Sequence, residues 1–190
     1  ELSMVAIVIF TAYICPFVIL IVKKQFSLMK SAGKRYLTVT LPDKKKEVVL
    51  FLLIGFFSGA VAQTPFGPWL SRMLTSVFGD FTFGISLFIA LSMIIISSFG
   101  FHPVMVATLY VTTVDPAALD MSVTYFAVLL LGAWGIATAV SPMTAVNFMV
   151  ASFMKEPLVN TSIRWNTVFS TFALVTLLIY LSLLAGMNLI

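Results

Sequence analysis

The sequence predicts an all-α polytopic membrane protein, a helix bundle with interrupted helices and re-entrant hairpins. Apolar residues (AVILMFWYC) make up 61% of the 190 residues, charged residues only 9%, and the mean hydropathy is +1.10. Soluble globular chains contain about 45–50% apolar and about 25% charged residues. The apolar residues also lie in long runs without charge, and two of these runs are too long for one straight helix across a bilayer. These three observations exclude a water-soluble domain.

Five runs without a charged residue are expected to enter the membrane as helices. A helix needs about 20 apolar residues to cross a hydrocarbon core about 30 Å thick, and every run meets that length. The runs are Leu2–Val22, Val48–Ser71, Phe81–Val114, Met121–Met154 and Trp165–Ile190. The first run has its basic flank at its carboxyl end, unlike a signal peptide, and the chain opens at Glu1 without a methionine. We expect these residues to be part of a longer chain with further helices upstream.

Most of the positive charge lies in the segment 23–46, between the first two runs. This segment holds eight of the eleven Lys and Arg residues of the chain. Because Lys and Arg are enriched in cytoplasmic loops of membrane proteins, we expect a basic cytoplasmic loop here. The chain then divides into a first transmembrane helix (1–22), this loop (23–46) and a membrane transport domain with broken helices (47–190). A patch that binds lipid headgroups or nucleic acid is the alternative for the same charge, and we expect no nucleic-acid partner.

The two runs of 34 residues, Phe81–Val114 and Met121–Met154, must be interrupted. As straight helices they would be about 50 Å long at about 1.5 Å per residue, an excess that tilt does not absorb. Proline with small and polar residues marks where they break, at residues 97–103 (the Pro103 break) and residues 138–144 (the Pro142 break). Residues 62–68 (the Pro65 break) have the same composition. Since proline removes a backbone donor, the carbonyls freed at each break need partners in protein or in a water-filled cavity.

A polar residue stands directly before the proline at each break: Thr64, His102 and Ser141. Proline is favoured at the first position of a helix, and Ser or Thr is favoured just before it as the N-cap. We therefore expect each proline to begin a new half-helix inside the membrane. Helix N-termini carry partial positive charge and unpaired N–H groups, so two or three at one point would form an anion site without Lys or Arg. A plain proline kink, with the hydroxyl bonded to a freed carbonyl, is the alternative at each break.

Glycines precede two of the breaks at similar spacing. Gly55 and Gly59 lead into the Pro65 break, and Gly132 and Gly135 lead into the Pro142 break. Small residues let helices approach closely, so these glycines predict the packed arms of hairpins. Paired interrupted segments are typical of transporter sites.

Polar side chains at the breaks form the candidate site. His102 is the one ionisable residue well inside an apolar run, and such residues mark functional sites in membrane proteins. A hydrogen bond to a freed carbonyl is its alternative role. Hydroxyls, amides and open carbonyls suit a carboxylate or another oxyanion together with Na⁺. The predicted substrate-binding residues are Gln63, Thr64, Ser98, His102, Ser141, Thr144 and Asn147.

Enzyme chemistry and metal cofactors lack suitable residues in this sequence. It has one His and one Cys, Cys15, and none of the motifs GxSxG, HExxH or the P-loop. Zinc and haem sites therefore lack their ligands. We expect no enzymatic activity, no catalytic residue, no resident metal and no cofactor, while coupling to Na⁺ or H⁺ is left open.

The order of these breaks resembles one half of the ion-transporter superfamily. In that order a hairpin-like segment is broken at Thr64-Pro65, a helix at His102-Pro103 and a second hairpin-like segment at Ser141-Pro142, before a closing helix. Members of that superfamily carry dicarboxylates, citrate or other anions, often with Na⁺, and the membrane subunits of tripartite periplasmic transporters are similar. The resemblance covers Glu47–Ile190 and is architectural. The Ser-Asn-Thr hairpin signature of the family is missing, since residues 141–144 read Ser-Pro-Met-Thr. This departure bears on both the substrate class and Na⁺ coupling.

Together these patterns predict a secondary active transporter, or half of one, for a small anionic solute bound at the broken-helix tips near the bilayer midplane. A non-transporting membrane subunit or scaffold of a larger complex is the alternative. The expected partners are the lipid bilayer, the anionic solute and either a second copy of the chain or a partner membrane subunit. The expected location is the bacterial inner membrane. The resemblance implies re-entrant hairpins at 48–78 and 122–154, with full spans as the alternative for both.

Overall fold

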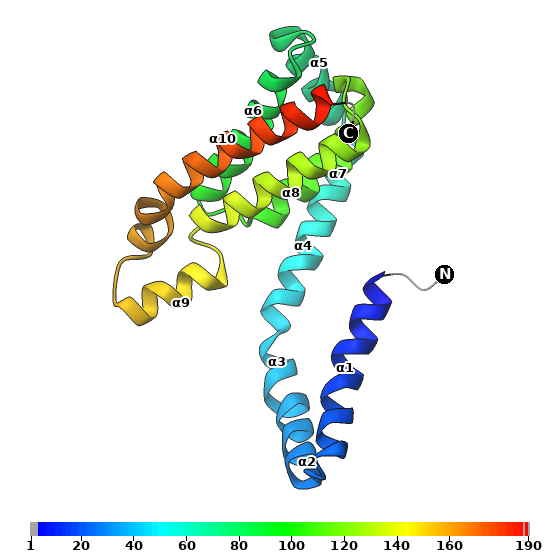
Figure 1. Cartoon of the computed structure of the whole chain (residues 1–190), viewed down its shortest axis with the longest axis vertical. Coiled ribbons are helices and arrows are strands. Elements are labelled where there is room, and N and C mark those ends of the chain that lie inside the picture. The colour runs from blue at the N-terminus through cyan, green and yellow to red at the C-terminus, as the bar shows by residue number, and fades with distance from the viewer. Residues whose placement is uncertain (1–3, 188, 190) are drawn as a thin grey trace. The chain divides into compact units, whose positions relative to one another are not determined.

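The computed structural model describes residues 4–187 and 189, and all regular secondary structure in them is helical (Figure 1). Residues 2–3, 188 and 190, at the ends of the first and last predicted runs, lie outside the described residues. The chain forms two units, residues 1–52 and 53–190, which are taken one at a time below. The elements are α1 (Met4–Val22), α2 (Phe26–Arg35), η1 (Tyr36–Thr40), α3 (Leu41–Asp43), α4 (Lys45–Ala62), α5 (Phe66–Phe78), α6 (Thr82–Ser98), α7 (Pro103–Thr113), η2 (Pro116–Leu119), α8 (Val123–Val140), α9 (Ala145–Met154), η3 (Asn160–Arg164) and α10 (Trp165–Gly186).

The first unit is a helical hairpin, and the segment predicted as a basic loop is helical instead. α1 ends at Val22, the chain turns at Lys24 with a φ of +54°, and α2, η1 and α3 continue as helix up to Asp43. Apolar residues of α2 recur at helical spacing, for example Met29 and Ala32, and give it one apolar face. The prediction that this segment is a cytoplasmic connection between two membrane runs stays a prediction.

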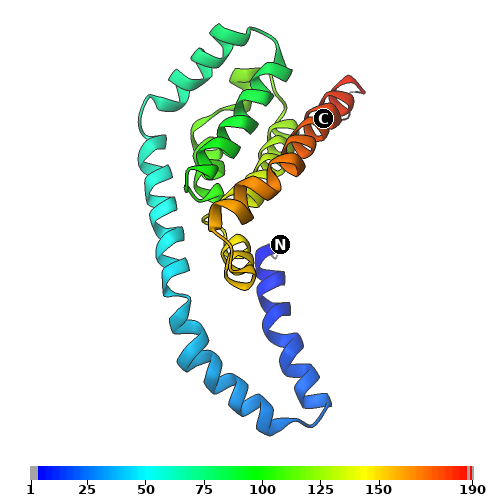
Figure 2. The same ribbon diagram turned by 90° about the vertical axis from the view of Figure 1, so that its left-hand side faces the viewer.

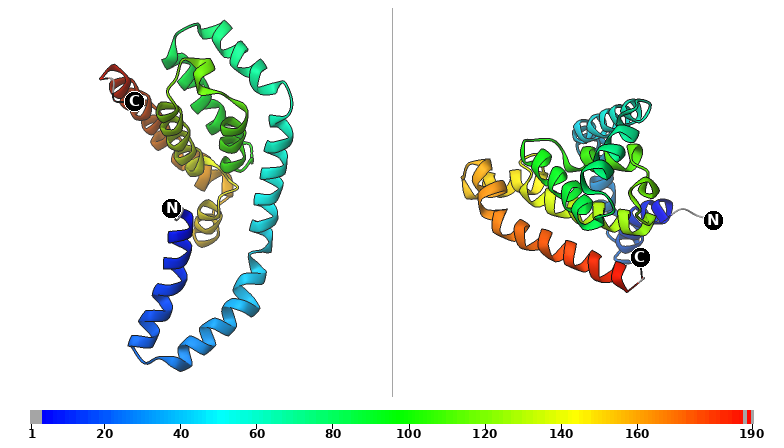
Figure 3. Two further views of the ribbon diagram at one scale, coloured as in Figure 1. Left: turned by 90° about the vertical axis from the view of Figure 1, so that its right-hand side faces the viewer. Right: turned by 90° about the horizontal axis from the view of Figure 1, so that it is seen from above.

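The second unit is built around α6, α8 and α10. α8 packs against α6 on one side and α10 on the other, as Figures 2 and 3 show. Their contact surfaces are apolar, and the side chains of Ile89, Leu129 and Leu181 have no exposed area. α6 and α8 pack against each other and run in the same direction. A hydrogen bond of 2.9 Å between Ser86 and Tyr125, near the first turns of the two helices, indicates this direction. The ends of these two helices therefore lie at the same level.

Two segments of the described chain are long and apolar enough to cross a membrane. They are Val123–Met154, which combines α8 and α9, and Asn160–Gly186, which combines η3 and α10. The pair Val48–Ala62 and Phe66–Phe78 would make a third span if it were counted as one, although it bends by 70°. The predicted run Met121–Met154 is thus confirmed as a segment of spanning length. The predicted run Phe81–Val114 is divided after Ser98 into two shorter helices, α6 and α7.

The chain reverses direction at the Pro103 break, which the sequence assigned to a broken helix rather than to a hairpin. Ser92 on α6 and Tyr110 on α7 share a hydrogen bond of 2.6 Å, at equal distances from the turn. Gly100 has a φ of +98°, a backbone conformation that glycine adopts without steric cost, and it lies in the turn. The other two breaks are less sharp, since α4 and α5 bend by 70°, and α8 and α9, although separated by a turn, together count as one segment of spanning length.

The hydrogen bond between the arms of the α6–α7 hairpin gives a first prediction. Tyr110→Phe removes one partner, while Ser92 keeps its bond to the Ile89 carbonyl. We expect the free energy of unfolding to fall by about 1 kcal/mol, the usual contribution of one hydrogen bond. Thermal unfolding of the purified chain in detergent measures this loss. Tyr180→Phe, at a side chain that is 52% exposed on α10, is the matched control and should leave stability unchanged.

Of the four glycines predicted to allow close packing, one does so. A Cβ added at Gly132 would lie 2.5 Å from a Leu177 side-chain atom, so this glycine lets α10 approach α8. Nothing lies within 4 Å of a Cβ added at Gly55, Gly59 or Gly135. The glycine pattern therefore marks a packing point between two helices and not the arms of two hairpins.

Candidate functional site

The Pro103 and Pro142 breaks lie against each other at one end of the second unit. The Ser141 hydroxyl lies 3.5 Å from the Phe101 carbonyl oxygen and donates to it. A Cβ added at Gly100 would lie 4.0 Å from Cγ of Met143. The contact follows from the parallel course of α6 and α8, whose last residues are followed directly by the two breaks. The prediction that separate helix breaks meet in space holds for this pair.

Side chains of α9 hold the carbonyls that are freed at the end of α8. The side-chain amide of Asn147 donates to the carbonyls of Ala139 at 2.8 Å and Ser141 at 2.9 Å, with a longer contact to Thr138 at 3.4 Å. The Thr144 hydroxyl lies 3.1 Å from the Ser141 carbonyl. Both side chains are 6% exposed. Asn147 and Thr144 therefore brace the break. This is the role that the alternative interpretation gave to polar residues at a break, namely hydrogen bonding to freed carbonyls.

Asn166 completes this brace, and the sequence prediction did not include it. It lies in the first turn of α10, and its amide donates to the carbonyls of Ala139 at 3.1 Å, Thr161 at 2.8 Å and Ser162 at 2.9 Å. One side chain thus connects α10 to the end of α8. The signal in the sequence was an amide near the start of the apolar run Trp165–Ile190.

The predicted half-helices begin close to the prolines but not always at them. α7 begins at Pro103, and His102 is its N-cap, with Nδ1 accepting from the Val104 N–H at 3.3 Å, so this prediction is confirmed. α5 begins at Phe66, one residue after Pro65. α9 begins at Ala145, three residues after Pro142, because the Ser141 hydroxyl first accepts the Met143 N–H at 3.2 Å in a turn.

The N-terminus of α9 presents backbone donors without partners. Among the described residues, nothing accepts a hydrogen bond from the N–H groups of Ala145, Val146 and Asn147, whereas the Phe148 N–H bonds to the Thr144 carbonyl. In the last turn of α6, the Ser97 hydroxyl is fully buried and has no hydrogen-bond partner among the described residues. The run 121–154 contains no charged residue. Free donors and the positive end of a helix in apolar surroundings favour an anion.

The structure does not bring all seven predicted site residues together. His102, Ser141, Thr144 and Asn147 lie at the paired breaks. Ser98 also lies in the Pro103 break, but its hydroxyl donates to the Ile94 carbonyl of its own helix at 2.8 Å.

Gln63 and Thr64 are exposed at the bend between α4 and α5 and lie away from the paired breaks. The next helix, α5, touches the far end of α7, where an added Cβ at Gly67 would meet Thr113. Thr113 is about 15 Å along α7 from Pro103, at about 1.5 Å per residue. Two of the three helix breaks therefore meet, and not all three as expected. Gln63 and Thr64 lie toward the opposite end of the α6–α7 hairpin.

Within residues 4–187 and 189, no three His, Cys, Asp or Glu side chains lie close enough to hold a metal ion. Comparison with protein-family models, curated proteins and solved structures gives no match. The site is defined by its own geometry: two helix breaks in contact, braced by amides and hydroxyls, with unpaired backbone N–H groups at the start of α9.

Proposed function

We propose that this chain is a polytopic membrane protein and forms part of a secondary active transporter for a small anionic solute. The observation that carries the proposal is the N-terminus of α9, where the N–H groups of Ala145, Val146 and Asn147 are unpaired next to the Pro103 break. Anionic substrates bind at the N-termini of broken helices in transporters, because the helix dipole and free N–H groups replace water without a charged side chain.

The surface of the second unit supports a location in the membrane. Only 22% of an apolar stretch of 18 residues within Asn160–Gly186 is buried inside the protein. Phe169 and Phe172 on α10 are 59% and 71% exposed, and Leu131 on α8 is 62% exposed. Large apolar side chains on the outside of both spanning candidates are stable against lipid and unfavourable in water. The bacterial inner membrane stays part of the proposal on the resemblance to the ion-transporter superfamily.

The same geometry favours anion binding over a Na⁺ site built from carbonyls. The carbonyls of Ala139 and Ser141, which would be the natural ligands of a cation at this break, already accept hydrogen bonds from Asn147. The unpaired groups are donors. We therefore propose that the solute contacts backbone N–H groups, and that the side chains of Asn147 and Thr144 hold those groups in place without touching the solute.

Ala145→Pro tests this proposal, because it deletes one free N–H and leaves the helix intact. Ala145 is exposed and is the first residue of α9, a position where proline is tolerated. Thr144 before it has φ −87° and ψ 139°, the extended conformation that precedes proline. Since hydrogen bonds to charged groups contribute about 1.5–3 kcal/mol, the Kd of the bound anion should rise about 10- to 150-fold.

The measurement is the thermal stability of the purified chain with succinate or citrate, with and without Na⁺. A bound anion raises apparent stability by mass action. Val123→Pro is the matched control, because Val123 is the first residue of α8, is 75% exposed and follows Ser122 in the extended conformation. Stabilisation of the parent chain that Ala145→Pro weakens and Val123→Pro preserves supports the proposal. Equal binding by Ala145→Pro, or no stabilisation by either acid, contradicts it.

A non-transporting membrane subunit is the second candidate, and α9 favours it. α9 packs mainly against η3, and Phe148 and Phe153 on it are 65% and 79% exposed. A partner subunit seated on this helix would cover them. Copurification of a stoichiometric partner, together with no solute flux in liposomes, would favour the subunit over the transporter.

A further inference from the structure

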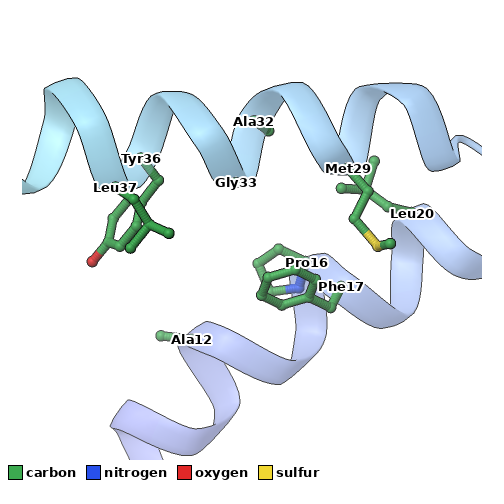
Figure 4. A pocket seen from close by; sticks show the side chains of 9 residues that line it. All are labelled: Ala12, Pro16, Phe17, Leu20, Met29, Ala32, Gly33, Tyr36 and Leu37. Atoms are coloured by element: carbon green, nitrogen blue, oxygen red, sulfur yellow. The ribbon is translucent and has the colours of Figure 1, made fainter.

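The first unit contains an apolar groove between its two helical arms. α1 and α2 diverge from the turn at Lys24 and leave a space of about 500 Å³ (Figure 4). Phe17 and Leu20 of α1 line one wall, and Met29 of α2 and Tyr36 of η1 line the other, with small residues between them. The volume is far larger than the share of one water molecule, about 30 Å³. The walls are apolar along their length, so an elongated apolar group fits the groove best.

Three exposed lysines lie near the narrow end of this groove. Lys23 and Lys24 form the turn that joins the two arms. Lys30 follows Met29, which lines the narrow end together with Leu20. All three lysines are exposed, and in the described part of the chain their side chains have no hydrogen bond or ion pair. The unit thus offers an apolar cleft that ends in a cluster of free cations.

We propose that this groove binds one acyl chain of an anionic phospholipid, whose phosphate lies against Lys23, Lys24 and Lys30. A free phosphate would use the lysines and leave the groove empty, and an uncharged lipid would use the groove and leave the lysines unpaired. An anionic phospholipid matches both features at once. Basic segments next to a membrane helix attract anionic lipids, and lysine stems lie along apolar surface while the ammonium groups stay in water. This site is independent of the anion site proposed in the second unit.

The test compares lipid binding by the full chain in detergent, titrated with equal amounts of dioleoyl phosphatidylglycerol and dioleoyl phosphatidylcholine and measured by native mass spectrometry. The parent chain should prefer phosphatidylglycerol. In Lys23→Gln/Lys30→Gln the preference should fall about 25-fold, since each lysine near anionic lipid contributes about fivefold. Arg35→Gln/Lys45→Gln is the control, because it removes the same charge from the same basic segment farther along the helices from the narrow end.

A second variant tests the acyl-chain seat without changing charge. Gly33 lines the groove, and nothing lies within 4 Å of a Cβ added there, so a side chain can start at this position and Gly33→Leu is designed to occupy the groove. It should reduce binding of both lipids at unchanged helix content by circular dichroism. Equal loss of the preference in the two charge variants would show diffuse attraction and overturn the site. Unchanged lipid binding by Gly33→Leu would overturn the acyl-chain seat.

Discussion

Asn147→Asp should destabilise the second unit more than any other single change at the paired breaks. The Asn147 amide nitrogen donates to the carbonyls of Ala139 and Ser141, and the side chain is 6% exposed. A carboxylate of the same shape would place a buried negative charge against these carbonyl oxygens and could donate to neither. Breaking a buried polar pairing and leaving a charge costs about 3–5 kcal/mol. Denaturant unfolding of the purified chain in detergent measures this loss.

Two further variants separate the charge from the lost hydrogen bonds. Asn147→Ala removes the donors alone and should cost about 1–3 kcal/mol, because buried carbonyls are left unsatisfied. Asn166 still donates to the Ala139 carbonyl, which limits the loss. Asn160→Ala is the matched control, since among the described residues the Asn160 amide bonds only to Glu156, at the surface, and it should change stability by no more than about 0.5 kcal/mol. Asn147 variants as stable as the Asn160 control would refute the bracing role.

This result also separates a brace from a ligand. A residue that only touches solute would, when replaced, reduce solute binding at unchanged stability. A brace reduces both together, because the N–H groups of α9 lose their position when the break opens. For Asn147 we expect the coupled loss, whereas Ala145→Pro should reduce binding alone. The two positions lie two residues apart, and stability is expected to fall in the Asn147 variants and to stay unchanged in Ala145→Pro.

Gly67→Ala should be the second strongly destabilising change, for a steric reason. A Cβ at this position would lie 1.8 Å from the Thr113 carbonyl oxygen and 2.8 Å from the Thr113 carbonyl carbon. Both are backbone atoms, which no change of rotamer moves away, so α5 and the end of α7 would have to separate. Overpacking of this kind costs about 1–3 kcal/mol, and we expect the upper end of that range. Thermal unfolding in detergent provides the measurement.

Gly59→Ala is the informative comparison for Gly67→Ala, because it should raise the free energy of unfolding where Gly67→Ala lowers it. Gly59 lies inside α4, and nothing lies within 4 Å of a Cβ added there. Replacing glycine by alanine within a helix is favourable by about 0.5–1 kcal/mol when space allows. A destabilised Gly59→Ala together with a neutral Gly67→Ala would contradict the packing described for α5 and α7.

The sequence located the helix breaks well because proline acts locally. Pro103 begins α7, and His102 caps that helix as predicted, since both effects depend only on neighbouring residues. The start of α9 was missed by three residues, because the Ser141 hydroxyl stabilises a turn that competes with helix. The helices within the segment 23–46 were not predicted, because its charges obscured the apolar face of α2.

What the sequence could not determine is which breaks meet and what their polar residues do. Hydropathy and proline specify where helices begin and end. Because the three breaks have similar composition, the sequence was equally consistent with a site formed by all three breaks and with a site formed by two of them. The reversal at Gly100 and the parallel packing of α6 on α8 place Phe101 beside Ser141, and α5 against Thr113 keeps Gln63 and Thr64 at the other end.

The sequence alone therefore determined an all-helical chain with apolar segments of spanning length, interrupted at prolines, because composition and local backbone chemistry decide those features. Only the tertiary structure decided that Asn147 and Asn166 satisfy the carbonyls at the end of α8 while the N–H groups of α9 stay free. Hydrogen bonds between residues 27 positions apart, such as Asn166 to Ala139, depend on how the helices pack and leave no mark on local sequence.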